Sequence, residues 1–121
     1  LKKFKTINLI DESTRIARTA KFGQNVIIMK NVSIGIEAEI GDNVIIYPNT
    51  TIDHDTKIGS HSHICPGVAI AGNVNIGEAV FLGIGCVISN KITIGANAVI
   101  GAGAVVIKNI EADSIYKGFR C

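Results

Sequence analysis

The three histidines of this 121-residue chain all lie in one short stretch, TIDHDTKIGSHSHICPG. His54 stands between Asp53 and Asp55, and His61 and His63 flank a single serine. Imidazole gains and loses a proton near neutral pH, which suits it to proton transfer in an enzyme. The rest of the chain is dominated by aliphatic, small and amide side chains, so this stretch is the first candidate for a chemical site.

Composition and charge exclude several classes of protein. Lysine and arginine number 12 against 10 acidic residues, and the basic residues are scattered rather than gathered into the stripe of a nucleic-acid-binding protein. No apolar run approaches the ~18 residues of a membrane span. The three cysteines are an odd number without regular spacing, which argues against a disulfide framework and indicates a reducing, cytoplasmic compartment.

A six-residue repeat organises almost the whole chain. When the sequence is cut in sixes from Asn25, the hexads NVIIMK, NVSIGI, EAEIGD and their successors follow one another without insertion. Position two of the hexad is small or apolar, and position five is usually Gly, Ala, Ser or Asp. Position four is always aliphatic: Ile28, Ile34, Ile40, Ile46, Ile52, Ile58, Ile64, Ile70, Ile76, Leu82, Ile88, Ile94, Ile100 and Val106.

Strand alternation gives this repeat a physical meaning. Side chains two apart share a face, so positions two and four point inward and position three points outward. A small residue at position five is expected where the chain bends tightly. Each hexad is then one short strand and a turn, and three hexads make one triangular coil. The sequence predicts an all-β fold, a parallel β-helix of about five to six triangular coils that stack to bury a continuous core.

The repeat also predicts the division of the chain. Residues 13–110 are expected to form the β-helix, residues 1–12 a trace of an upstream domain or a leading strand, and residues 111–121 a C-terminal tail. The chain opens on Leu1 rather than methionine, which favours an upstream part.

The coil length separates the histidines in space. His54 ends its hexad and is expected at a corner, whereas His63 occupies position three and is expected to point outward from a strand. The two are one and a half hexads apart, which is half of a coil, so they must lie on different sides of one prism. We therefore expect any site that uses both to form between subunits of a threefold homotrimer. His61 opens a hexad near a turn and is expected to be a solvated loop residue.

The motifs carry a family resemblance. The His-acid pair, the step SHICPG, the segment AGNVNIG and the late GAGAVV follow in this order, and the similarity covers nearly the whole chain. This pattern resembles the hexapeptide-repeat, left-handed β-helix acetyltransferases of the sialic acid O-acetyltransferase type. It is most similar to the bacterial enzymes that N-acetylate nucleotide-linked 4-amino-sugars. The left-handed winding is implied by the resemblance, because general chirality rules favour the opposite hand.

The resemblance implies an acetyl-CoA-dependent transfer to a sugar, with site residues at matching positions. His54 would be the general base and Asp55 its carboxylate partner, although the sequence leaves Asp53 as an alternative. His63, from the neighbouring subunit, would lie near the acetyl or thiol end of the cofactor. The backbone N–H of Gly72 would face the thioester oxygen, with a plain turn residue as the alternative.

Further contacts to the cofactor follow from the same resemblance. Gly83, Ile84 and Ala102 match positions whose main chain holds the pantetheine, although small corner residues also serve packing. Lys108 is more simply a solvated lysine than a phosphate ligand. No cysteine stands where an acyl carrier is expected, which favours direct transfer. No metal site is predicted.

Three other functions compete with this interpretation. A metal hydratase similar to the γ-type carbonic anhydrases would need a different histidine spacing. A non-catalytic trimeric fragment would lack the N-terminal α/β domain of roughly 80–100 residues that holds the nucleotide-sugar in the resembled family. An O-acetyltransferase for a free sugar would use the same base. The sequence leaves the acceptor sugar and the choice between N- and O-acetylation open.

Overall fold

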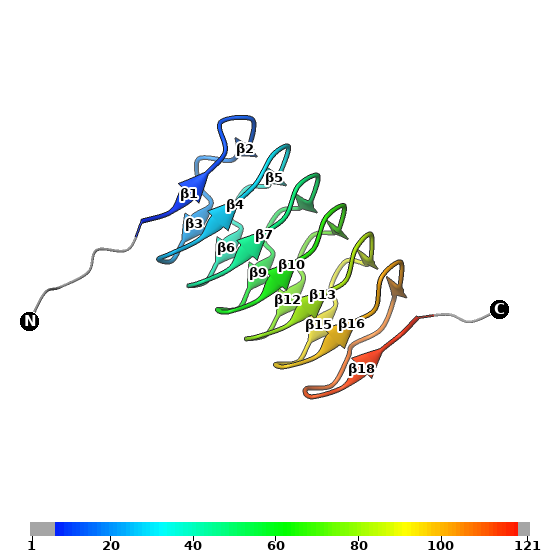
Figure 1. Cartoon of the computed structure of the whole chain (residues 1–121). Coiled ribbons are helices and arrows are strands. Elements are labelled where there is room, and N and C mark those ends of the chain that lie inside the picture. Colours follow the sequence, from blue (N-terminus) through cyan, green and yellow to red (C-terminus); the bar gives the residue numbers. More distant parts are fainter. Residues whose placement is uncertain (1–6, 119–121) are drawn as a thin grey trace, which may run out of the picture.

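The structure is a computed structural model that describes residues 7–118. These residues form a stack of triangular coils built from eighteen strands of two residues each, all in parallel pairings (Figure 1). The described residues contain no helix, hence none that could span a membrane. The predicted all-β, left-handed parallel β-helix is confirmed.

The strands fall into three sheets, one on each side of the prism. Sheet A contains β1 (Leu9–Ile10), β4 (Ile27–Ile28), β7 (Ile45–Ile46), β10 (His63–Ile64), β13 (Phe81–Leu82), β16 (Val99–Ile100) and β18 (Ile115–Tyr116). Sheet B contains β2 (Arg15–Ile16), β5 (Ser33–Ile34), β8 (Thr51–Ile52), β11 (Ala69–Ile70), β14 (Val87–Ile88) and β17 (Val105–Val106). Sheet C contains β3 (Lys21–Phe22), β6 (Glu39–Ile40), β9 (Lys57–Ile58), β12 (Asn75–Ile76) and β15 (Thr93–Ile94).

The register follows the predicted coil of three hexads. Ile64 pairs with Ile46 in the coil before it and with Leu82 in the coil after it, each one coil away along the chain. The seven strands of sheet A bound six successive coils, in agreement with the expected number. The last coil is shorter than the others, because Val99 pairs with Ile115 and not with Lys117, the residue a full coil further on.

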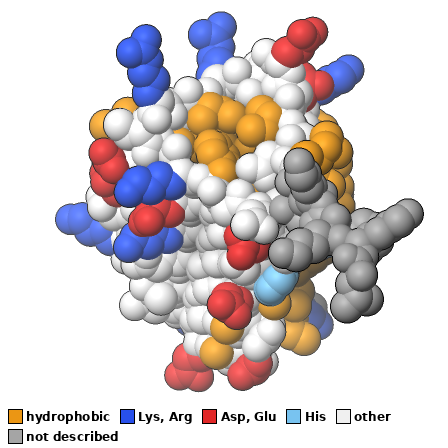
Figure 2. Space-filling view, turned by 90° about the vertical axis from the view of Figure 1, so that its left-hand side faces the viewer, with side chains coloured by type: hydrophobic (Ala, Val, Ile, Leu, Met, Phe, Trp, Pro, Cys, Tyr) orange, Lys and Arg blue, Asp and Glu red, His pale blue; other side chains and the backbone are white. Residues whose placement is uncertain are grey.

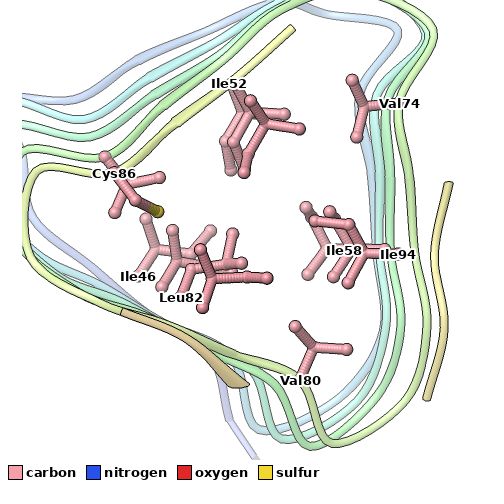
Figure 3. Close-up of a cluster of buried hydrophobic side chains, with 14 of the residues drawn as sticks. Ile46, Ile52, Ile58, Val74, Val80, Leu82, Cys86 and Ile94 are labelled. Atoms are coloured by element: carbon pink, nitrogen blue, oxygen red, sulfur yellow. The ribbon is translucent and has the colours of Figure 1, made fainter. Parts of the chain in front are cut away.

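The inward positions form a dry core. Figure 3 shows Ile46 and Leu82 entering from sheet A, Ile52 from sheet B, and Ile58 and Ile94 from sheet C. Position-two side chains fill the corners of the triangle, as Val74, Val80 and Cys86 do in Figure 3. The buried core residues are apolar with three exceptions, Thr50, Thr56 and Ser62, each of which has 0% exposure.

The corners correct one expectation. From Asn25 to Gly103, the left-handed residue of each turn is position one of the hexad, as at Asn43 with φ 56° and Asn73 with φ 58°, and not position five. Asparagine tolerates this conformation better than most side chains, which explains its frequency there. Glycine at position five serves a different need, since a Cβ at Gly41 would come within 2.7 Å of the Ser60 amide nitrogen in the next coil. The close stacking of coils, rather than a bend, selects glycine at position five.

The regular winding extends beyond residues 13–110 at both described ends. β1 pairs with β4 in sheet A, and β18 pairs with β16 in the same sheet. Among residues 7–118 no coil lies over the first one, and Ile10 keeps an exposed fraction of 43%. Figure 2, which faces this end, shows hydrophobic side chains gathered in a patch that backbone and other side chains, drawn in white, surround. Residues 1–6 and 119–121 lie outside the described residues, so an upstream origin of residues 1–12 stays a prediction.

The three outer faces differ in chemistry. The outward residues of sheet C are polar or charged, with Lys57 Nζ 3.5 Å from Glu39 Oε2. Sheet A is mostly apolar outside: Phe81 is 44% exposed and Ile115 is 70% exposed. Sheet B becomes apolar toward the C-terminal end, where Val87 and Val105 face outward. Sheet C is therefore the face best suited to water.

Candidate functional site

His54 lies at the corner between sheets B and C, separated from the end of β8 by Asp53. The next residue, Asp55, takes the left-handed conformation with φ 56°. Its N–H donates to the Ile36 carbonyl at 2.9 Å in the preceding coil. This turn brings the side chains of His54 and Asp55 toward each other at the edge of the prism.

The imidazole and the Asp55 carboxylate are paired. His54 Nδ1 lies 2.8 Å from Asp55 Oδ2, and both side chains are nearly half exposed. Because the carboxylate accepts, Nδ1 carries the proton, and Nε2 of the neutral ring is left with a lone pair. The hydrogen bond that His54 donates to Asp55 is the main cause that raises the pKa of His54 above its usual 6.5. Desolvation lowers this pKa, and the nearby charges of Asp53 and Asp55 raise it further.

Asp53 has a different partner. Its Oδ1 accepts the backbone N–H of His54 at 2.7 Å, so this carboxylate holds the corner of the chain rather than the ring. The sequence left either aspartate as the partner of the imidazole, and the geometry selects Asp55 for the contact with Nδ1.

Gly72 lies against the other side of the imidazole, one coil further along. A Cβ built on Gly72 would be 2.5 Å from His54 Nε2 and 2.7 Å from Cε1, so only glycine leaves room for the ring. The Asn73 N–H donates to the His54 carbonyl at 3.0 Å and fixes the stacking of the two corners. Gly72 does not have a positive φ, so the turn itself does not require glycine.

The Gly72 amide is a free donor beside the imidazole of His54. Among the described residues it donates to no backbone or side-chain acceptor, whereas its carbonyl accepts the Lys91 N–H at 3.1 Å. An unpaired N–H close to an unprotonated Nε2 is the pairing that acyl transfer requires, with one group to take a proton and one to stabilise a developing oxyanion.

The other two histidines lie elsewhere. His63 begins β10 on the outer face of sheet A, between the rings of Tyr47 and Phe81, with centroid distances of 6.4 Å to each. His61 is exposed at the corner between sheets C and A, where its Nδ1 lies 3.2 Å from Asn43 Nδ2. It has φ 67° and continues a column of corner residues, which makes it part of the winding rather than of the site.

The residues predicted to hold the pantetheine lie at the corner between sheets A and B. The Gly83 N–H donates to the Ile100 carbonyl at 2.8 Å, and a Cβ on Gly83 would meet the Ala102 nitrogen at 2.6 Å. Ile84 is 60% exposed. Within one chain sheet B separates this corner from His54, so the structure groups His54, Asp55 and Gly72 but not the remaining predicted residues.

The described cysteines and metal-binding side chains add no reactive group to the site around His54. Cys65 and Cys86 are buried and free, and burial raises the pKa of Cys65 and raises that of Cys86 to about 12. Within residues 7–118, no group of three or more His, Cys, Asp or Glu residues is arranged to hold a metal ion. Lys108 extends over the Tyr116 ring, with Nζ 6.0 Å from the centroid.

Comparison with known proteins identifies the family of this chain. The model of the bacterial transferase hexapeptide family (six repeats) matches residues 37–72 and 73–108. Among curated proteins, none matches the chain significantly.

Solved structures share both the fold and part of the sequence. PerB from Caulobacter crescentus, solved with CoA and GDP-perosamine, superposes with a TM-score of 0.92 at 35% identity over 93% of this chain and 54% of PerB. The acetyltransferase domain of PglB from Neisseria gonorrhoeae, solved with acetyl coenzyme A, gives a TM-score of 0.88 at 31% identity over 89% of this chain and 53% of that one. The chain thus spans about half the length of these relatives.

Proposed function

Since the chain belongs to the bacterial transferase hexapeptide family, we propose that it transfers an acetyl group from acetyl-CoA to a sugar, with His54 as the general base. The observation that supports this proposal most strongly is the grouping of His54, Asp55 and Gly72 at one corner, where the two side chains are nearly half exposed and Gly72 is buried beside the ring. The predicted resemblance to the hexapeptide acetyltransferases agrees with the family match and with the two relatives solved with CoA or acetyl coenzyme A.

The chemistry assigned to the chain is direct transfer. His54 Nε2 removes a proton from the attacking amine or hydroxyl, and Asp55 supports the imidazolium that results. The Gly72 N–H donates to the thioester oxygen as negative charge develops on it. Acetyl-CoA supplies the activated acyl group, and collapse of the adduct releases the CoA thiolate, which takes up the proton from the imidazolium and leaves as the thiol. Both free cysteines of the described residues are buried, which fits a mechanism without an acyl-enzyme.

The complete site is assigned to a homotrimer. Sheet A and the C-terminal part of sheet B carry apolar outer faces and sheet C the charged one, so sheet A of one prism would pack against sheet B of the next. This packing would bring His63 of a neighbouring subunit toward His54. It would also place the pantetheine along the groove beside Gly83, Ile84 and Ala102.

The acceptor is proposed to be a nucleotide-linked amino-sugar in surface glycan synthesis, and the setting to be the cytoplasm. The support is the relative solved with GDP-perosamine, together with the absence of a membrane-spanning helix among residues 7–118. O-acetylation of a sugar is the alternative, because a base at Nε2 can deprotonate a hydroxyl as well as an amine. The described residues contain no cluster that supports the metal hydratase alternative.

A direct test measures CoA release with the purified protein, acetyl-CoA and a panel of amino-sugars and nucleotide-linked amino-sugars. Turnover of an amino-sugar with formation of an amide supports N-acetylation, and formation of an ester supports the alternative. If acetyl-CoA binds but no acceptor is turned over, the result supports the alternative of a non-catalytic β-helix that binds the cofactor. If acetyl-CoA does not bind either, the proposed function is wrong.

The shared site has its own test by mixing subunits. His54→Ala and His63→Ala each remove one half of every site, so the separate variants are expected to be impaired. Random mixed trimers would each contain one site with both histidines, and about a quarter of all sites would be intact. Recovery to about a quarter of the parent activity supports the trimer, and no recovery contradicts it.

A further inference from the structure

One coil of the helix departs from the apolar pattern of its interior. Its three corner positions carry the hydroxyl side chains Thr50, Thr56 and Ser62, each with 0% exposure. The other buried position-two residues from Val26 to Ala104 are Val, Ala, Ile or Cys. The coil with the hydroxyls also carries His54 and His63.

The buried hydroxyls bond to the backbone of the next coil in a common pattern. The Ser62 hydroxyl donates to the Gly77 carbonyl at 3.1 Å and accepts the Val80 N–H at 3.1 Å. These two groups lie on either side of a turn, so one hydroxyl holds both ends of that turn. Thr50 makes only the first of these two bonds, in which its hydroxyl donates to the Cys65 carbonyl at 3.1 Å.

Thr56 makes the same two hydrogen bonds to the turn that contains Gly72. Its hydroxyl donates to the Ala71 carbonyl at 2.8 Å and accepts the Val74 N–H at 3.2 Å. The same oxygen lies 3.4 Å from the His54 carbonyl. One buried atom is therefore tied to both flanks of Gly72 and to the backbone of the base that faces Gly72.

The apolar alternative would fit this position. The equivalent corner holds Ala38 in the coil before and Val74 in the coil after, and both are buried. Burying a hydroxyl has a desolvation cost that only its hydrogen bonds offset. A threonine here is explained by what its hydroxyl holds in place, because a methyl group would fill the same space.

We propose that Thr56 is a positioning residue that sets the Gly72 amide against His54 Nε2, and the catalytic part of this inference rests on the proposed function. Loss of the hydroxyl releases both ends of the Gly72 turn and leaves the partly buried Ala71 carbonyl and the buried Val74 N–H without their partner. The donor and the base then lose their fixed separation, and a displacement of about 1 Å at such a site can lower the rate of transfer by ~10²-fold.

The kinetic test compares Thr56→Val, Thr56→Ser and the matched control Thr50→Val. Thr56→Val is expected to lower kcat by at least ~10-fold with little change in the KM for acetyl-CoA. Thr56→Ser keeps the hydroxyl and is expected to recover most of kcat. Thr50→Val removes the same kind of buried hydroxyl at the corner between sheets A and B and is expected to keep kcat near that of the parent. Equal kcat losses in Thr56→Val and Thr50→Val would mean that the hydroxyl is merely structural.

A second measurement does not depend on turnover. Amide hydrogen exchange of the segment 71–74 is expected to accelerate by at least ~10-fold in Thr56→Val and to stay near the parent rate in Thr56→Ser and Thr50→Val. Unchanged exchange in Thr56→Val would overturn the positioning role. If the parent protein proves inactive with every acceptor, the proposed function fails while the exchange result still decides what Thr56 holds.

Discussion

The imidazole of His54 occupies the space that a side chain on Gly72 would need, with Nε2 2.5 Å from the position of that missing Cβ. The two residues are separated along the sequence by one coil of the helix. On its other side the ring is held by Asp55 through Nδ1 at 2.8 Å. The stacking of coils thus places an imidazole with a defined tautomer beside an unpaired backbone donor.

Gly72→Ala is expected to displace the imidazole, because the new methyl group would overlap the ring. We expect kcat to fall by at least ~10²-fold, since the base moves away from the donor. The measurement is steady-state kinetics together with the thermal midpoint. Gly101→Ala serves as the stability control, because its Cβ would find its nearest neighbour at 3.4 Å. Parent-like turnover in Gly72→Ala would separate Gly72 from the chemistry.

His54→Ala is expected to lower turnover by at least ~10²-fold while acetyl-CoA still binds, since the base is lost and the main-chain contacts remain. Turnover assays and calorimetry of acetyl-CoA binding measure the two effects separately. His61→Ala is the matched control, because that ring lies at another corner and contacts Asn43. If His54→Ala retained full activity, another group would have to be the base.

The pH profile is expected to report the pairing of His54 and Asp55. The neutral imidazole is the active form, and the carboxylate raises the pKa of His54, so the acid limb of kcat/KM is expected to lie above pH 6.5. Asp55→Asn removes the largest cause of the raised pKa, so the limb should move to lower pH while the plateau falls through loss of tautomer control. Profiles are compared with the same acceptor, so that titration of the acceptor cancels. An acid limb that stays in place would contradict the pairing.

Gly59→Ala is expected to destabilise the protein strongly, although Gly59 lies outside the site. Its Cβ would collide with the carbonyl of Gly77 in the next coil, where backbone cannot give way cheaply. We expect a loss of about 2 kcal/mol or more in the free energy of unfolding, measured by urea titration at fixed protein concentration. Gly101→Ala, at the same hexad position with more room, should lose less than Gly59→Ala. Equal losses would mean that coil contact does not select glycine at position five.

The buried thiols are expected to resist alkylation. Burial raises the pKa of Cys86 to about 12 and also raises that of Cys65, so little thiolate is present at pH 8. Iodoacetamide should label both residues much more slowly in the native protein than in guanidinium, as followed by peptide mass. Fast native labelling of Cys86 would show that the core opens at this corner.

Much of the fold was predictable because every coil repeats the same requirement. An aliphatic residue at every sixth position and strand alternation determine which side chains point inward, and the coil length of three hexads then determines the register. Ile46, Ile64 and Leu82 stack as that pattern predicts. The prediction that a tight bend selects glycine at position five was wrong. The close approach of the next coil selects it, and that contact joins residues distant in sequence.

The sequence by itself determined the β-helix and the separation of His54 from His63, because both follow from counting along a regular winding. Only the tertiary structure decided that Asp55 and not Asp53 binds the ring, that glycine at 72 makes room for the imidazole, and that Thr56 ties the Gly72 turn. These relations depend on side-chain direction and on backbone that meets across coils. Spacing along the chain fixes the neighbours of a residue, but not which of their atoms come into contact.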